Sequence, residues 1–197
     1  MDRKIFKEEH NIFRDAFKKY AAKEIAPHLE KWDEEGIVPR EAFQKMGDNG
    51  FLCPWLDEKY GGMGAGFQYS LVIVEEMAYI GCNSLMPSLH SDITVPYIYN
   101  YGSEEQKMKW LPGCASGDIM TAIAMTEPNT GSDIAAIKTT AIRDGNDYII
   151  NGQKTFISNG IQNDLVVVAV KTDPKAGFKG ISLIVVENGT PGYNKGL

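Results

Sequence analysis

The chain has 197 residues, of which 43% are hydrophobic and 23% charged, and its formal net charge at pH 7 is −6. These are the proportions of a soluble globular protein that is long enough to bury a core in one or two domains. The negative charge argues against a nucleic-acid binder, which would show a basic stripe, and against a polybasic membrane anchor.

The cysteines and the N-terminus bear on the cellular compartment. Cys53, Cys82 and Cys114 are odd in number and lack the spacing of a metal site, which favours buried free thiols in a reducing compartment. No apolar run approaches the roughly 18 residues of a membrane span. The segment MDRKIFKEEHNIF mixes charged and apolar residues without a signal-peptide core. The sequence therefore predicts a cytoplasmic protein with no membrane contact.

The first half of the chain carries the three- and four-residue apolar spacing of helices. Residues 5–32 predict an amphipathic helix that is kinked or broken near Pro27. Pro39 suits the first turn of a short helix over residues 41–46.

The helical pattern continues to the middle of the chain. Residues 68–80 are apolar on most faces and predict a buried helix, and residues 88–100 predict another. Ser103-Glu-Glu-Gln106 is a capping box, which predicts the start of a helix that ends before Pro112.

The second half changes to short segments rich in β-branched residues. Six predicted strands cover residues 119–125, 138–143, 148–150, 154–157, 165–170 and 181–186. Asp144–Asp147 and Asn151-Gly152 have the turn chemistry of hairpins. Strands at this spacing predict a small antiparallel barrel or sandwich. We expect an α+β chain, with an all-α helical domain over residues 1–117 and a β domain over residues 118–197.

Several other segments and side chains could suggest a functional site but lack the spacing that such a site needs. Gly61–Gly66 has the wrong spacing for a dinucleotide fingerprint and follows no strand, which favours a flexible turn. Burial could raise the pKa of Glu75 or Glu76 toward that of a base, but neighbours in a helix point about 100° apart. We expect these two carboxylates to pair with a cation. Packing or surface roles are expected for the histidines, His10, His28 and His90.

Two polar segments have the composition of a cofactor site. Met125–Asp133, MTEPNTGSD, is rich in residues that hold turns and leave N–H groups and hydroxyls pointing outward. Asn151–Gly160, NGQKTFISNG, adds the flat ring of Phe156 and the hydroxyl of Ser158. Such groups suit a planar, hydrogen-bonding cofactor such as an isoalloxazine. Taken alone, the first segment is explained equally well as an ordered connection between strands.

The two segments resemble the flavin-contacting segments of the acyl-CoA dehydrogenase family. AMTEPNTGSDIAAIKTTA followed by YIINGQKTFISNG is similar to the family's middle domain, and WLDEKYGG, YGSEEQ and GISLIVVE are similar to further parts. The resemblance covers essentially the whole chain, with motif details closest to long-chain-type members. It implies an all-α N-terminal domain, a small antiparallel β-barrel middle domain and bound FAD. The family's C-terminal helical bundle has no counterpart in the sequence.

The resemblance also implies roles for single residues. The Thr126 hydroxyl and neighbouring N–H groups would bond the flavin's pyrimidine edge, Phe156 would pack on the rings and Ser158 would reach flavin N5. The family's commonest residues at the last two positions are Trp and Thr. The implied flavin-binding set is Ile123, Ala124, Met125, Thr126, Gly131, Ser132, Phe156, Ile157 and Ser158. The implied substrate-binding set is Ser132, Phe178, Lys179, Leu85, Met86 and Leu89, of which the last three are equally well explained as core.

The reaction implied by the resemblance is α,β-dehydrogenation of an acyl-CoA thioester to the trans-2-enoyl-CoA. A carboxylate takes the α-proton while the β-hydrogen passes as hydride to the flavin. The family's base is a glutamate of the C-terminal domain, and no glutamate of this chain aligns with it. We therefore expect a truncated chain that binds FAD weakly and is inactive alone. The implied partners are the acyl-CoA, an electron-transfer flavoprotein and, for the full-length enzyme, further copies of itself.

Two other interpretations stay open. The same architecture would also suit an acyl-CoA oxidase or a flavin monooxygenase, and the reactivity of the reduced flavin with oxygen would separate these from a dehydrogenase. A non-catalytic flavin- or acyl-CoA-binding module, whole at 197 residues, is the third possibility.

Overall fold

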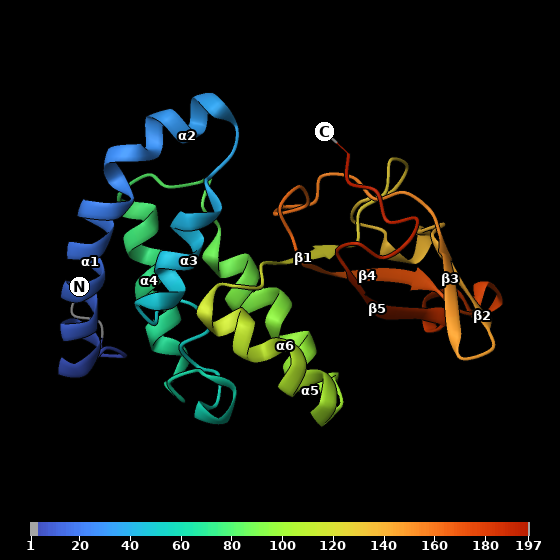
Figure 1. Cartoon of the computed structure of the whole chain (residues 1–197), viewed down its shortest axis with the longest axis horizontal. Coiled ribbons are helices and arrows are strands. Elements are labelled where there is room, and N and C mark those ends of the chain that lie inside the picture. Colours follow the sequence, from blue (N-terminus) through green and yellow to red (C-terminus); the bar gives the residue numbers. More distant parts are fainter. Residues whose placement is uncertain (1–3, 197) are drawn as a thin grey trace. The chain divides into compact units, whose positions relative to one another are not determined.

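A computed structural model of the protein describes residues 4–196. The chain divides into two compact units, Met1–Ile119 and Met120–Leu197. The first unit is built from helices and the second from strands and loops (Figure 1). Each unit has a core of its own and is described separately below.

The first unit begins with two helices joined by a short 3₁₀ turn. Helix α1 spans Glu8–Glu24, the 3₁₀ turn spans Ala26–His28 and α2 spans Leu29–Glu35. The predicted break near Pro27 is confirmed. It follows from the proline ring, which has no N–H to donate and clashes with the carbonyl four residues earlier.

The later helices follow the predicted positions with two corrections. Helix α3 spans Arg40–Asp48, α4 Phe67–Tyr79, α5 Val95–Tyr101 and α6 Glu104–Ser116, and a π-helical turn, Leu89–Thr94, precedes α5.

The capping box that starts α6 is confirmed. Ser103 Oγ accepts from the Gln106 amide at 3.2 Å, and Gln106 Oε1 accepts from the Ser103 amide at 2.9 Å. The predicted end of this helix before Pro112 is wrong, because α6 continues to Ser116. The turn after the proline buries Cys114 and Ala115, and this packing offsets the cost of about 3 kcal/mol that an interior proline carries.

Helix α4 is buried on one side only, which corrects the expectation of a buried helix. Its inner side holds Val72, Ile73 and Met77, whereas Val74 and Tyr79 are exposed. An apolar sequence alone does not identify the side of a helix that meets the core.

The carboxylates of α4 form ion pairs with α1, as expected. Arg14 donates to Glu75 Oε2 at 2.9 Å and to Glu76 Oε1 at 2.5 Å. Glu76 is buried, so the arginine neutralises a charge that would otherwise cost several kcal/mol. The pair fixes α1 against α4 and has no sign of a catalytic arrangement.

The histidines and cysteines of the first unit have the packing and surface positions expected. Cys53, Cys82 and Cys114 are buried free thiols. His10 is buried and accepts from the Lys7 amide at 2.8 Å, whereas the exposed His28 stacks on Trp32. The described residues include no group of His, Cys, Asp or Glu side chains placed to hold a metal ion. None of the helices described is long and apolar enough to cross a bilayer.

The second unit is a five-stranded sheet arranged around one buried strand. The strands are β1 (Thr121–Ala124), β2 (Thr140–Asp144), β3 (Asp147–Asn151), β4 (Leu165–Lys171) and β5 (Ile181–Glu187). Strand β4 is buried along almost its whole length, as its run of apolar residues requires.

The strand pairing corrects the expectation of an antiparallel barrel. Strand β1 pairs with β4 in parallel and β5 pairs with β4 antiparallel, while β2 meets β4 in parallel only at Thr140 and Lys171. The described sheet is therefore mixed and open. Pairing between strands that are distant in the chain is set by the path of the intervening segments, which periodicity does not report.

The turns of the second unit gave one correct and one wrong prediction. Asp144–Asp147 forms the β2–β3 hairpin, with Gly145 at a φ of +60°. Asn151-Gly152 does not form a hairpin, and residues 154–157 are not a strand. A Cβ on Gly152 would lie 2.3 Å from Thr139 Oγ1, so this glycine permits a close approach of two segments instead.

Acidification is expected to destabilise the first unit between about pH 6.5 and pH 4. Burial lowers the pKa of His90 from 6.5 to about 4, although the hydrogen bond of its Nε2 to the Cys114 carbonyl opposes this. The unfolded chain binds the proton at higher pH than the folded one. Stability is therefore complete above pH 6.5 and falls as the pH decreases to 4, by about 3 kcal/mol.

Denaturant unfolding followed by helical circular dichroism across this range measures the effect. A His90→Gln variant keeps a donor to Cys114 and cannot titrate, so its stability should depend less on pH. Equal pH slopes for the two proteins would contradict the assignment.

Candidate functional site

The two polar segments of the sequence lie side by side in the second unit. The Thr155 amide donates to the Thr126 carbonyl at 3.0 Å, and Lys154 Nζ donates to the Met125 carbonyl at 3.0 Å. Segment 125–133 leaves the end of β1, and segment 151–160 leaves the end of β3. The structure thus joins the residues for which cofactor roles were expected.

A buried carboxylate lies at the centre of this arrangement. Glu127 Oε1 accepts from the Thr139 amide at 2.9 Å, from Thr139 Oγ1 at 2.6 Å and from Lys154 Nζ at 2.9 Å. Its Oε2 accepts from the Lys138 amide at 2.6 Å. The side chain of Glu127 is 3% exposed and that of Lys154 10%, so both charges are withdrawn from water.

The charge of Glu127 is secured by its donors. Burial alone would raise the pKa of this carboxyl. The hydrogen bonds from Thr139, Lys138 and Lys154 outweigh burial and lower the pKa to about 2. Glu127 therefore stays ionised down to about pH 2, and a carboxylate of such low basicity is not suited to act as a general base.

Sequence reasoning missed Glu127, Lys154 and Thr139. The glutamate was interpreted as part of a turn and the lysine as part of a strand. One signal was available, because Lys154 stands close in the sequence to the apolar Phe156 and Ile157, and a lysine that is withdrawn from water with such neighbours must find an acceptor for its ammonium group.

Three hydroxyls of the two segments are uncommitted. Among the described residues, no hydrogen bond involves the side chains of Thr126, Ser132 or Ser158. By contrast, Thr130 Oγ1 donates to the Asp133 carbonyl at 2.6 Å. Thr126 and Ser158 are half-buried and Ser132 is exposed. These hydroxyls are free to donate to, or accept from, a bound polar group.

Phe156 is held in an unusual conformation. Its side chain is 92% exposed, and its φ is +56°, in the left-handed region that bulky residues avoid. Backbone strain of this kind is concentrated at functional sites. An exposed ring on a strained backbone offers a flat apolar face to a planar ligand.

The other expected flavin-binding residues surround these groups. Ala124 is buried and Ile123 is half-buried on β1, and Ile157 packs against the core of the sheet. Gly131 is exposed, with open space where a Cβ would be. None of these residues has a polar side chain, so a ligand would contact their main-chain groups or small apolar side-chain surfaces.

The expected substrate residues fall in both units. Phe178 and Lys179 are exposed in the 3₁₀ segment Pro174–Gly180 of the second unit. Leu85, Met86 and Leu89 belong to the first unit, where Leu85 is buried, Leu89 half-buried and Met86 38% exposed.

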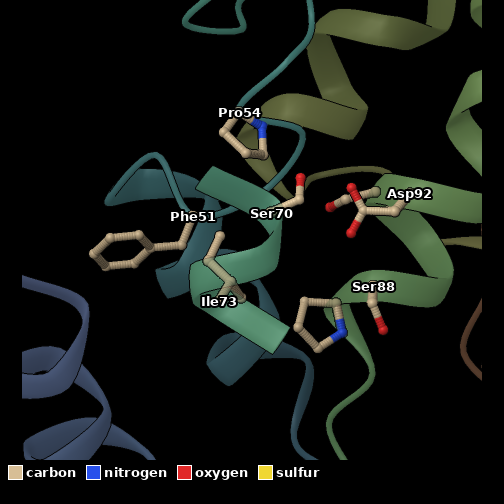
Figure 2. Close-up of a pocket in the computed structure, with 8 residues that line it drawn as sticks. Phe51, Pro54, Ser70, Ile73, Ser88 and Asp92 are labelled. Atoms are coloured by element: carbon tan, nitrogen blue, oxygen red, sulfur yellow. The ribbon is translucent and has the colours of Figure 1, made fainter. Parts of the chain in front are cut away.

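The first unit has a small hollow, and two of its lining residues, Pro87 and Ser88, lie between Met86 and Leu89 in the sequence. It is lined by Phe51, Pro54, Ser70, Ile73, Pro87, Ser88, Ser91 and Asp92 (Figure 2). Burial raises the pKa of Asp92, and the nearby Ser70 and Trp55 side chains offset this only in part. The roughly 160 Å³ of empty space in the hollow includes space open to solvent, so the hollow is too small to hold a cofactor.

Comparison with known families accounts for nearly all of the described chain. The model of the acyl-CoA dehydrogenase N-terminal domain matches residues 7–118, and that of the acyl-CoA dehydrogenase middle domain matches residues 122–196. The chain belongs to the acyl-CoA dehydrogenase family.

Individual members of the acyl-CoA dehydrogenase family are similar over almost the whole chain. The mitochondrial long-chain specific acyl-CoA dehydrogenase of Sus scrofa is 44% identical over 196 residues, which are 98% of this chain and 46% of the relative. A crystal structure of an acyl-CoA dehydrogenase from Geobacillus kaustophilus is 57% identical, with a TM-score of 0.94 over 97% of this chain and 51% of that one.

A third relative carries a cofactor. The structure of a glutaryl-CoA dehydrogenase from Mycobacterium smegmatis in complex with FADH2 is 31% identical, with a TM-score of 0.88 over 96% of this chain and 48% of that one. The chain thus spans about half the length of the acyl-CoA dehydrogenases that it matches.

Replacing Phe156 by glycine is expected to give a more stable protein than replacing it by alanine. Both variants lose the exposed ring, but only glycine adopts a φ of +56° without strain. The left-handed conformation costs an L-residue roughly 1–2 kcal/mol, and the greater freedom of unfolded glycine offsets part of this. Denaturant unfolding should show an advantage of about 1 kcal/mol for Phe156→Gly. Without strain, the greater freedom of unfolded glycine would make Phe156→Ala the more stable variant, and that result would contradict the strain assigned to this position.

Proposed function

We propose that this chain provides the flavin- and thioester-binding part of an FAD-dependent acyl-CoA dehydrogenase, which converts an acyl-CoA to the trans-2-enoyl-CoA. The observation that carries the proposal is the junction of segments 125–133 and 151–160. It gathers the uncommitted hydroxyls of Thr126 and Ser158 and the exposed ring of Phe156 in one unit. Membership of the family supports the same reaction.

The residues present suit the isoalloxazine of FAD. The pyrimidine edge of that ring system needs hydrogen-bond donors, and Thr126 with the exposed Gly131 and Ser132 backbone would provide them. Phe156 would cover a face of the rings and exclude water from it, and Ser158 would hydrogen-bond near N5. Bound FAD supplies the acceptor for the hydride.

The protein groups would favour reduction of the bound cofactor through their position. Fixed donors at the pyrimidine edge stabilise the negative charge that develops there, without the reorganisation that water requires. These residues would bind and orient the cofactor, and none of them would remove the α-proton.

Substrate contacts follow from the same proposal. Lys179 would place a positive charge near the phosphates of coenzyme A, and Phe178 would contact its apolar arm. We assign Leu85, Met86 and Leu89 to the acyl chain and Ser132 to the region of the thioester. An electron-transfer flavoprotein would take the electrons, and the active assembly would be a homo-oligomer. A cytoplasmic location stays a prediction, and the relative from Sus scrofa is described as mitochondrial.

The visible spectrum of the protein made from its native gene tests the function. We expect bound flavin that acid releases as FAD and that bleaches anaerobically with at least one member of a panel of short, long and branched acyl-CoA thioesters. The product should be the corresponding 2-enoyl-CoA. The 197-residue chain alone should bind FAD weakly and bleach with none. Failure of the native protein to take up FAD would contradict the proposal, and rapid hydrogen peroxide formation in air would favour an oxidase.

Phe156→Ala is expected to weaken FAD binding by about two- to tenfold, because stacking of one aromatic ring contributes about 0.5–1.5 kcal/mol. Tyr148→Ala is a matched control, since Tyr148 is another exposed aromatic residue of the second unit, on β3. Fluorescence titration with FAD measures both. Equal losses in the two variants would argue against a ring contact at Phe156.

A further inference from the structure

Lys154 fixes the backbone on both sides of Thr126. Its ammonium group donates to the carbonyl of Met125 and to the side chain of Glu127, at 3.0 and 2.9 Å. The carbonyl of Thr126 itself accepts from the Thr155 amide. Three consecutive residues of the first segment are therefore tied to two consecutive residues of the second. These contacts fix the backbone from which the Thr126 hydroxyl projects.

Glu127 ties the same point to the sheet. Besides Lys154, it holds the amides of Lys138 and Thr139 and the Thr139 hydroxyl, which lie immediately before β2. Gly152 packs against Thr139 with no room for a Cβ. The second segment thus meets the residues just before β2 directly through Gly152, and Lys154 is connected to the same residues by way of Glu127.

The strained backbone of Phe156 lies between two anchors. On one side are Lys154 and the Thr155 amide, and on the other Asn159, whose Nδ2 donates to the Thr121 carbonyl at 3.1 Å. A non-glycine residue at positive φ persists only where its surroundings determine the conformation. Releasing the first anchor would let Phe156 return to an ordinary backbone conformation.

We propose that the Glu127–Lys154 pair is a positioning device that orients Thr126, Phe156 and Ser158 toward the flavin, which rests on the function proposed above. Neither residue touches the reacting atoms. Buried ion pairs contribute little stability compared with apolar side chains of similar size. Stability alone therefore does not explain why an ion pair stands at this position. This pair lies where both ligand-binding segments cross, so its loss should change the geometry of both segments as well as the stability of the unit.

The test compares three variants with the native protein. Lys154→Met removes the ammonium group and leaves Glu127 with its three other donors. Lys154→Arg keeps the charge and the donors. Thr172→Val is the control for stability, because the Thr172 hydroxyl meets Ser182 Oγ at 2.7 Å in the same unit without contact to either segment.

Three readouts separate positioning from stability: the dissociation constant for FAD, the flavin reduction potential, and amide hydrogen exchange of residues 125–132 and 155–159 in the flavin-free protein. We expect Lys154→Met to weaken FAD binding by at least about tenfold, to lower the potential and to speed exchange in both segments, because preorganisation is lost. Lys154→Arg should restore most of the affinity. Thr172→Val should lower the unfolding midpoint and leave the three readouts unchanged.

Two results bear on different proposals. A native protein that binds FAD, together with a Lys154→Met variant of unchanged affinity, potential and exchange, would overturn the positioning role and leave the proposed function standing. A native protein that takes up no FAD would overturn the proposed function. Faster exchange at Lys154→Met in that case would still support the ordering of the two segments by this pair.

Discussion

The second unit depends on one buried charge, the carboxylate of Glu127. An ionised carboxyl group withdrawn from water costs several kcal/mol unless it is paired and hydrogen-bonded, so every donor that it uses must be in place. Those donors come from Lys138, Thr139 and Lys154, at the start of β2 and after the end of β3. Meeting this requirement brings together the two segments that carry the candidate site.

Buried polar groups connect the helices of the first unit in a comparable way. Arg14 joins α1 to the two carboxylates of α4, and His90 of the π-helical turn meets the Cys114 carbonyl of α6. In both units, apolar burial provides the driving force for folding, while a few polar contacts select one arrangement of the elements. The contacts of the second unit also adjoin the uncommitted hydroxyls of Thr126 and Ser158 and the exposed ring of Phe156.

Local sequence signals predicted the elements better than their partners. The break at Pro27, the capping box at Ser103 and the β2–β3 hairpin depend on a few adjacent residues, and each was predicted. The parallel β1–β4 pairing was not, because it joins residues distant in the chain. For the same reason, motifs pointed to Thr126 and Phe156 as site residues, whereas the supporting role of Lys154 needed the structure. A lysine shows no partner in a one-dimensional pattern.

The parallel pairing of β1 with β4 has a consequence for the order of folding. Strands β2 and β3, and likewise β4 and β5, are neighbours in the chain and can pair early, whereas β1 and β4 must close the long loop that contains both ligand-binding segments. Non-local pairing is slow because its loop entropy is lost before contacts compensate for it. We therefore expect the site to be assembled late in folding and to be lost when β1 separates from β4.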